Sequence, residues 1–205
     1  MRHVYYKFVS DKTIESTEIV ENENNCWSKY LKINDKNTHY ISYHMKKFFA
    51  GPNEIKYNQY KKPIIDNGFF NISHDNNLCV GVFDCNNHIG IDVIHLERKL
   101  HDNHNKKMFN DSESKDIRQF SRKEAYLKMI GKGIFIVNLL DIQIVDGIIY
   151  NKGKAEPYNI FETTLDNYFI CIVGIFHPET DFILKEFHHA NALPLSLSNH
   201  FNTFL

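Results

Sequence analysis

Residues 78–94 read Leu-Cys-Val-Gly-Val-Phe-Asp-Cys-Asn-Asn-His-Ile-Gly-Ile-Asp-Val-Ile, and this stretch decides the fold class. It contains two runs, Leu78–Asp84 and His88–Ile94, rich in the branched and aromatic residues that favour strands. Asn-rich turn residues join the two runs. A further strand is predicted just upstream, over Gly68–Ile72. Together these segments predict consecutive strands separated by short turns.

Amphipathic helices are predicted on either side of these strands. Within residues 26–50 the apolar side chains have helical spacing, and Ala50-Gly51-Pro52 ends the pattern. Phe120–Ile130 is the clearest helix, with a capping box formed by Ser121 and Glu124. A Gly-Lys-Gly segment follows it and ends the helix.

The rest of the chain predicts further strands and little helix. The first hairpin joins Ile142–Val145 to Ile148–Tyr150 through Asp146-Gly147, and the second joins Tyr158–Thr164 to Tyr168–Phe176. An edge strand is predicted near His3–Val9, a charged surface segment over 98–119, and a tail from about residue 177. Helices and hairpins in this order indicate an α+β fold with antiparallel sheets.

Composition excludes several classes of function. The 205 residues carry a net charge of −1, so no overall field favours nucleic acid or an acidic membrane. The N-terminal residues lack the apolar segment of a signal peptide, and no apolar run is long enough to span a membrane. The four cysteines lack a C-x-x-C pair and metal-site spacing. We therefore expect a cytoplasmic protein.

Three charged side chains stand out against this background. Asp92 interrupts an apolar strand, where a carboxylate is costly to bury without a partner such as a cation. Glu124 and Lys128 are one helical turn apart and share a helix face. Two carboxylates and a lysine suit a hard cation that also binds phosphate, as Mg²⁺ does.

These residues lie in motifs that resemble a known family. Gly90-Ile91-Asp92, followed by Phe120-Ser-x-Lys-Glu-Ala-x-x-Lys, resembles the paired signature of the phosphopantetheinyl transferase superfamily. Asn71-Ile72-Ser73-His74 and the upstream Lys62-Pro63 resemble motifs of its larger, surfactin-synthetase-activating branch. The small branch shares the first two motifs, but its chains are near half this length and form trimers. Chain length and the Ser-His motif favour the large branch.

The resemblance covers residues 60–176 well and residues 1–59 only loosely. It implies one chain folded as two similar halves, each an antiparallel sheet with a packed helix, and an active site in the cleft between them. We predict these halves at 1–86 and 87–205. The implied activity transfers 4′-phosphopantetheine from coenzyme A to a serine of an apo acyl, peptidyl or polyketide carrier, releasing 3′,5′-ADP. We expect the enzyme to be a monomer.

The resemblance also implies the metal ligands. Asp92 and Glu124 would bind Mg²⁺, or Mn²⁺, which prefers the same oxygen ligands. Many relatives carry a glutamate where this chain has Ile94, which cannot ligate. Some members of the large branch instead use the residue after the Ser-His histidine, here Asp75. We therefore predict a metal triad of Asp75, Asp92 and Glu124, with an ordinary turn aspartate as the alternative for Asp75.

The same resemblance assigns the remaining site residues. The expected coenzyme A contacts are Lys62, Ser73, His74, Lys123 and Lys128, and the expected catalytic groups are Glu113 as general base, Glu124 and Lys128. The alternative for Glu113 is a plain surface glutamate, and for the two helical lysines a solvated helix face. Lys29, Lys32 and Lys46 are possible contacts of the adenine nucleotide.

The carrier and two rival functions stay open. A basic run could attract an acidic carrier helix, through Arg98, Lys99, Lys106, Lys107, Lys115, Arg118 and Arg122. The first rival is a non-catalytic coenzyme A- or carrier-binding relative, which the departure at Ile94 keeps open. The second is an unrelated metal-dependent phosphohydrolase, whose sites usually need a second metal and more ligands than this chain clusters.

Overall fold

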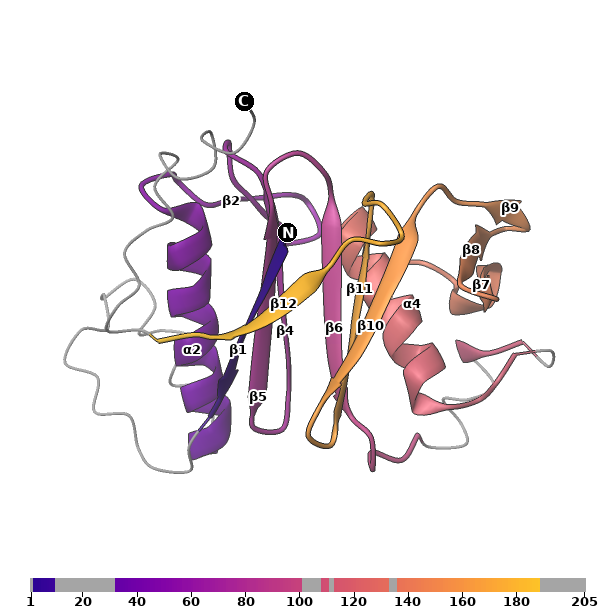
Figure 1. Cartoon of the computed structure of the whole chain (residues 1–205), viewed down its shortest axis with the longest axis horizontal. Coiled ribbons are helices and arrows are strands. Elements are labelled where there is room, and N and C mark those ends of the chain that lie inside the picture. The colour runs from indigo at the N-terminus through magenta and orange to yellow at the C-terminus, as the bar shows by residue number, and fades with distance from the viewer. Residues whose placement is uncertain (1, 10–31, 101–107, 111–112, 133–135, 189–205) are drawn as a thin grey trace.

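The structure is a computed structural model that describes residues 2–9, 32–100, 108–110, 113–132 and 136–188 (Figure 1). Two sheets make up its centre. The first has the strand order β12 (Phe182–Glu186), β1 (Arg2–Phe8), β5 (Leu78–Asp84) and β4 (Phe69–Asp75). The second has the order β10 (Asn159–Leu165), β11 (Tyr168–Gly174) and β6 (Ile89–His95). The predicted α+β class is confirmed.

Helix α2 (Ile33–Ala50) packs on β4 and β5 of the first sheet. Its apolar side chains Ile41, Met45 and Phe49 recur at the spacing of one helix face, and all three are buried in the core beside Phe70. The helix ends at Gly51, whose positive φ of 58° suits a residue without a Cβ. The predicted helix and its end are confirmed, and the part of the prediction over 26–31 lies outside the described residues.

Helix α4 (Ile117–Ile130) packs on β6 and β11 of the second sheet. The strand and helix touch closely at Gly90, where a Cβ would collide with the backbone of Ala125 and Met129. Only glycine therefore fits at position 90 of the Gly-Ile-Asp motif. Gly131 ends the helix in the left-handed conformation, as predicted.

The start of α4 differs from the sequence prediction. Asp116 is the N-cap, and its carboxylate accepts a hydrogen bond from the Gln119 N–H at 2.7 Å. Ser121 and Glu124 therefore lie inside the helix, so the predicted capping box is wrong. The misleading signal was a Ser-x-x-Glu spacing one turn downstream of the real cap.

The end of the described chain returns to the first sheet. β12 pairs in parallel with β1, for example Val4 with Leu184, so β1 lies between β12 and β5. The predicted edge position of β1 is wrong, and part of the predicted tail is a strand. This pairing joins a strand of the predicted half 87–205 to a strand of the predicted half 1–86. The division into these halves stays a prediction.

The smaller elements follow the predicted turns. β7 (Ile142–Val145) and β8 (Ile148–Asn151) form the hairpin around Asp146-Gly147, and β10 pairs with β11, so both predicted hairpins are confirmed. The remaining short elements are β2 (Lys56–Tyr57), β3 (Pro63–Ile64), β9 (Lys154–Ala155) and the 3₁₀ turn η1 (Leu139–Asp141). Among the described helices, none is long and apolar enough to cross a membrane.

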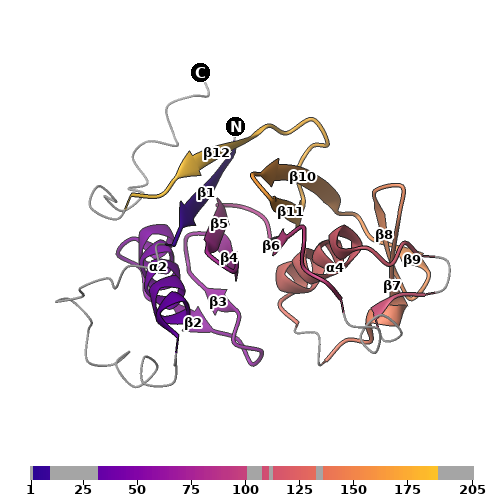
Figure 2. The same cartoon turned by 90° about the horizontal axis from the view of Figure 1, so that it is seen from below.

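The two sheets meet where β4 lies beside β6, between α2 and α4 (Figures 1 and 2). Side chains of β4 connect them: Asn71, Ser73 and Asp75 accept hydrogen bonds from the backbone N–H groups of Ile91, Val93 and His95. We call this line of contacts the seam. Because alternate residues of a strand share a face, all three acceptors point the same way.

Candidate functional site

Asp92 lies at the middle of the seam, and its carboxylate is buried. Its Oδ1 accepts hydrogen bonds from Lys128 at 2.6 Å and from Ser73 at 3.0 Å. Its Oδ2 accepts one from Ser121 at 2.7 Å. The three donors come from β4 and α4, so residues of three sequence motifs meet at this one side chain. A buried carboxylate needs such partners.

Lys128 links Asp92 to Ser73, because its ammonium group also donates to the Ser73 hydroxyl at 2.7 Å. The Lys128 side chain is partly exposed, while its ammonium group contacts the buried carboxylate. Lys128 is therefore not a freely solvated lysine on the helix face. Ser73 is itself buried and uses its hydroxyl within the seam, which differs from the predicted contact with coenzyme A.

Glu124 completes the charged group one turn before Lys128 on α4. Burial raises the pKa of this carboxyl to about 7, while the Lys128 ammonium opposes the rise and the Asp92 carboxylate adds to it. Two neighbouring carboxylates in a half-buried place repel one another, and a cation between them removes that repulsion.

A cavity of about 520 Å³ opens beside this group, between α2 and β4. Its lining includes Lys46 from α2, His74 and Asp75 from β4, and Arg98 from the segment after β6. Burial lowers the pKa of His74, and the nearby Lys128 lowers it further, while Asp75 and other carboxylates oppose both effects. Lys46, His74 and Arg98 offer N–H donors that an anion could use, while the carboxylates of Asp35 and Asp75 in the same lining offset part of the positive charge.

Asp75 is held on the rim of this cavity. Its Oδ2 accepts a hydrogen bond from the His95 N–H at 2.8 Å, and its Oδ1 binds Arg98 at 3.1 Å. The described residues contain no group of three His, Cys, Asp or Glu side chains that could hold a metal ion. The structure thus brings Asp92 and Glu124 together without adding Asp75 as a third member, and the ligand role of Asp75 stays a prediction.

The residues present fit a divalent cation at Asp92 and Glu124. Mg²⁺ typically takes one or two protein carboxylates and leaves its other positions to water and phosphate oxygens. The Asp92 carboxylate contributes to the raised pKa of Glu124, which means that the two negative charges lie near one another. Their carboxylate oxygens are the kind of ligand that such a cation binds.

Glu113 and Lys123 lie elsewhere, in a buried ion pair inside the core around α4. The two side chains are 2% and 0% exposed, and their charged atoms are 2.8 Å apart. The ammonium also donates to the carbonyls of Met108 and Leu139. Burial lowers the pKa of Lys123, and the Glu113 carboxylate opposes that change.

This placement differs from both predicted roles. Lys123 has no exposed side-chain area with which to meet a pyrophosphate. Glu113 also accepts hydrogen bonds from the Asn110 N–H and the Gln119 amide, so both of its carboxylate oxygens have partners inside the protein. The alternative of a plain surface glutamate is wrong, because the side chain is buried, and the role of general base stays a prediction.

Lys62 lies at the other end of the seam from His74. Its ammonium donates to the Met129 carbonyl at 2.6 Å, near the end of α4, and burial lowers its pKa to about 8. Its Cδ would be 3.0 Å from a Cβ added to Gly131. Lys62 thus joins the β2–β3 segment to α4, and its predicted contact with coenzyme A stays a prediction.

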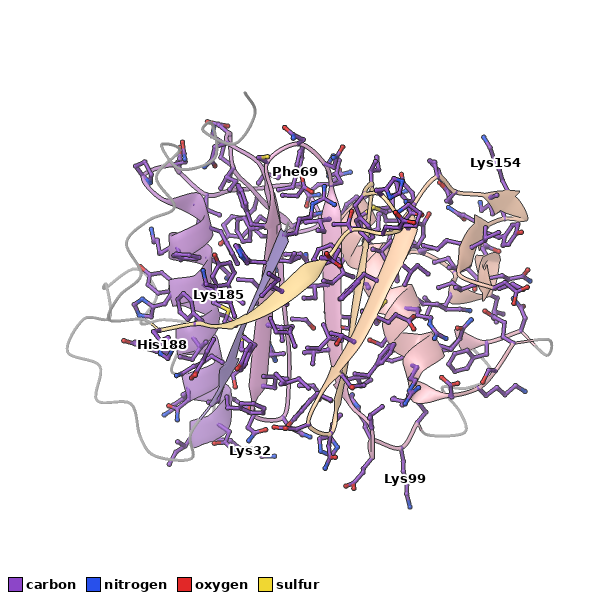
Figure 3. The ribbon with its side chains drawn as sticks, viewed as in Figure 1. Lys32, Phe69, Lys99, Lys154, Lys185 and His188 are labelled. Carbon is purple, nitrogen blue, oxygen red and sulfur yellow. The ribbon has the colours of Figure 1, made fainter. Side chains whose placement is uncertain are left out.

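The predicted basic run is partly neutralised. Arg98 pairs with Asp75, and Arg122 forms two bonds with Glu162, at 2.5 and 3.0 Å. Lys99 projects away from the ribbon at the same end of the molecule as Lys32 (Figure 3). Lys106, Lys107 and Lys29 lie outside the described residues.

Two features of the site were missed by sequence reasoning. The sequence pattern predicts a helix cap at Ser121, whereas its hydroxyl donates to Asp92. Arg98 was assigned to a docking surface, although it lines the same cavity as His74. A signal for Ser121 did exist: a serine in the middle of a helix is unfavourable unless its hydroxyl has a partner.

Comparison with known proteins supports the resemblance seen in the motifs. A 4′-phosphopantetheinyl transferase of Aneurinibacillus migulanus is 32% identical to this chain, over a stretch that covers 58% of this chain and 58% of the relative. The match therefore spans less than two thirds of the relative's length. No family model matches the chain. The predicted resemblance to the large branch of the phosphopantetheinyl transferases is confirmed.

Proposed function

We propose that this protein transfers the 4′-phosphopantetheine group of coenzyme A to a serine of an apo carrier protein. The observation that carries this proposal is the contact between Asp92 and Lys128 at 2.6 Å, beside Glu124 and next to the cavity lined by Lys46, His74 and Arg98. Residues from separate motifs of the family signature thus meet in one place, and their chemistry suits a pyrophosphate. The similarity to a named transferase supports the same reaction class.

The reaction moves a phosphoryl group between two oxygens. The carrier serine oxygen forms a bond to the β-phosphorus of coenzyme A, and the bond from that phosphorus to the bridging oxygen breaks. The electron pair leaves with 3′,5′-ADP, and the serine proton ends in solvent. Positioning and charge stabilisation supply most of the catalysis in such transfers.

This chain's residues supply both effects. The ammonium group of Lys128 is held by Asp92 and Ser73 on a partly exposed side chain, and it would bind a pyrophosphate oxygen as a point charge. In this proposal His74, Arg98 and Lys46 hold the phosphates of the nucleotide within the 520 Å³ cavity. The proposal assigns Lys46 to the nucleotide because it lines this cavity, whereas Lys62 bonds to the Met129 carbonyl.

Asp92 and Glu124 would hold a Mg²⁺ or Mn²⁺ ion, and Asp75 is the candidate for a further ligand. When bound, such a cation neutralises charge that develops on the phosphate oxygens. Glu113 is left out as general base, because its carboxylate is committed to Lys123 in the core. A two-halved active-site cleft, a monomer and a cytoplasmic location also belong to this proposal.

Intact-mass spectrometry tests the function directly. Two apo carriers, one acyl and one peptidyl, are incubated with coenzyme A, Mg²⁺ and this protein. We expect one carrier to gain the mass of one phosphopantetheine, and the gain to be lost when EDTA is added. Binding of coenzyme A without transfer to either carrier would favour the non-catalytic relative. Phosphate released from coenzyme A without a carrier would favour a phosphohydrolase.

A further inference from the structure

The Asp92 carboxylate receives one hydroxyl on each of its oxygens. Ser73 on β4 donates to Oδ1 at 3.0 Å, and Ser121 on α4 donates to Oδ2 at 2.7 Å. The hydroxyls thus reach the carboxylate from two elements that lie on different sides of β6. Two donors on opposite oxygens fix the plane of a carboxylate, whereas the single cation Lys128 on Oδ1 does not.

Both hydroxyls are built into the protein interior. Ser121 is 0% exposed and stands inside α4, where the cap role is already filled by Asp116. Ser73 is also buried, and it accepts hydrogen bonds from the Val93 N–H at 3.3 Å and from Lys128 at 2.7 Å. Ser73 therefore ties the backbone of β6, the carboxylate and the ammonium together.

We propose that Ser73 and Ser121 are positioning residues that orient the Asp92 carboxylate for a divalent cation. This inference rests on the proposed function for the cation itself. Its physical basis is general: partners in the outer shell of a metal site fix the orientation of its ligands, and losing one typically weakens metal affinity or activity about 10–100-fold.

Ser121 carries the sharper test, since its only hydrogen bond among the described side-chain contacts goes to Asp92. Mn²⁺ binding is measured by electron paramagnetic resonance on the protein without coenzyme A or carrier. We expect Ser121→Ala and Ser73→Ala each to weaken Mn²⁺ binding about 10–100-fold. Ser121→Cys keeps nearly the same volume with a weak donor, so it tests the same contact if the alanine variant does not fold.

Gln119→Ala is the matched control. Gln119 is also buried on α4, but its amide donates to Glu113 and to the Ile144 carbonyl, away from Asp92. We expect this variant to lose stability in urea unfolding while its Mn²⁺ affinity stays within about twofold of the wild type, because the cation site is untouched.

The outcomes separate this inference from the function on which it rests. If the wild type modifies a carrier and binds Mn²⁺, and Ser121→Ala binds Mn²⁺ equally tightly, the positioning role is wrong and the transfer function stands. Equal weakening in Gln119→Ala would also overturn it, because general destabilisation would then explain the loss. A wild type that transfers phosphopantetheine but binds no Mn²⁺ would overturn the inference as well.

Discussion

The substitution Gly90→Ala adds one methyl group where strand β6 and helix α4 touch. An alanine Cβ at this position would lie 2.8 Å from the Met129 Cβ, and closer still to the Ala125 carbonyl oxygen and the Met129 backbone nitrogen. Two of these atoms belong to the helix backbone and cannot move by a change of rotamer. The helix would therefore have to shift as a unit away from the sheet.

The cost follows from what that shift disturbs. The helix buries Ala125, Leu127 and Met129 in the core, each at most 1% exposed. Overpacking a well-packed core typically costs 1–3 kcal/mol, and a clash with backbone belongs at the upper end, so we expect a loss of about 3 kcal/mol or more. For a chain of this size that loss lowers the melting temperature by about 6–12 °C.

Urea unfolding followed by circular dichroism measures this difference. Gly174→Ala is the control, because Gly174 is also buried in the second sheet but its added Cβ would meet neighbours at 3.1 Å and beyond. We expect that variant to lose only about 1 kcal/mol, a common cost for a single substitution. If Gly90→Ala stayed within about 1 kcal/mol of the wild type, the close helix–strand contact would be wrong.

Three further predictions concern charged side chains. Lys123→Met should lower the free energy of unfolding by about 3–5 kcal/mol in urea, because it leaves the Glu113 carboxylate buried without its cation, and an unchanged value would contradict the buried pair. The free energy of unfolding of Glu124→Gln, measured in urea without divalent cations, should exceed that of the wild type at pH 8 by at most about 3 kcal/mol. At pH 4 the two values should be nearly equal. The pKa of Glu124 in the folded protein is about 7, above the usual 4.5, so ionisation of Glu124 lowers the free energy of unfolding of the wild type as pH rises between these values. The same difference between variant and wild type at pH 4 and at pH 8 would refute this. Lys46→Ala should weaken coenzyme A binding about tenfold in calorimetry, whereas Lys47→Ala, one residue along and exposed, should not, and equal losses would remove the cavity from the site.

Much of the fold could be predicted because local signals and tertiary structure agree. The Asp146-Gly147 turn, the helical spacing of Ile41, Met45 and Phe49, and the glycine after α4 each indicate one structure, and that structure forms. The pairing of β12 with β1 could not be predicted in this way. Parallel pairing between distant segments leaves no local pattern, and Phe182–Glu186 alone is a weak strand signal.

The site shows the same division. Asp92, Glu124 and Lys128 were predicted together from motif spacing, and the structure gathers them. Lys123 shares the motif of Glu124 and is its sequence neighbour, but adjacent helical residues point in different directions, and Lys123 enters the core. The spacing of the residues predicts the helix. Which of its lysines is buried depends on the packing of η1 and of the segment near Glu113 against α4.

The most direct test of the central claim is the rate at which Asp92→Asn modifies an apo carrier, compared with Asp84→Asn. Asp84 is an equally suitable aspartate for comparison, since it is buried and paired with Arg2 at 2.5 Å, at a place away from Lys128. If the seam is the reaction site, Asp92→Asn loses about 100-fold or more of the rate while Asp84→Asn loses only what its lower stability explains. Near-normal transfer by Asp92→Asn would contradict the account.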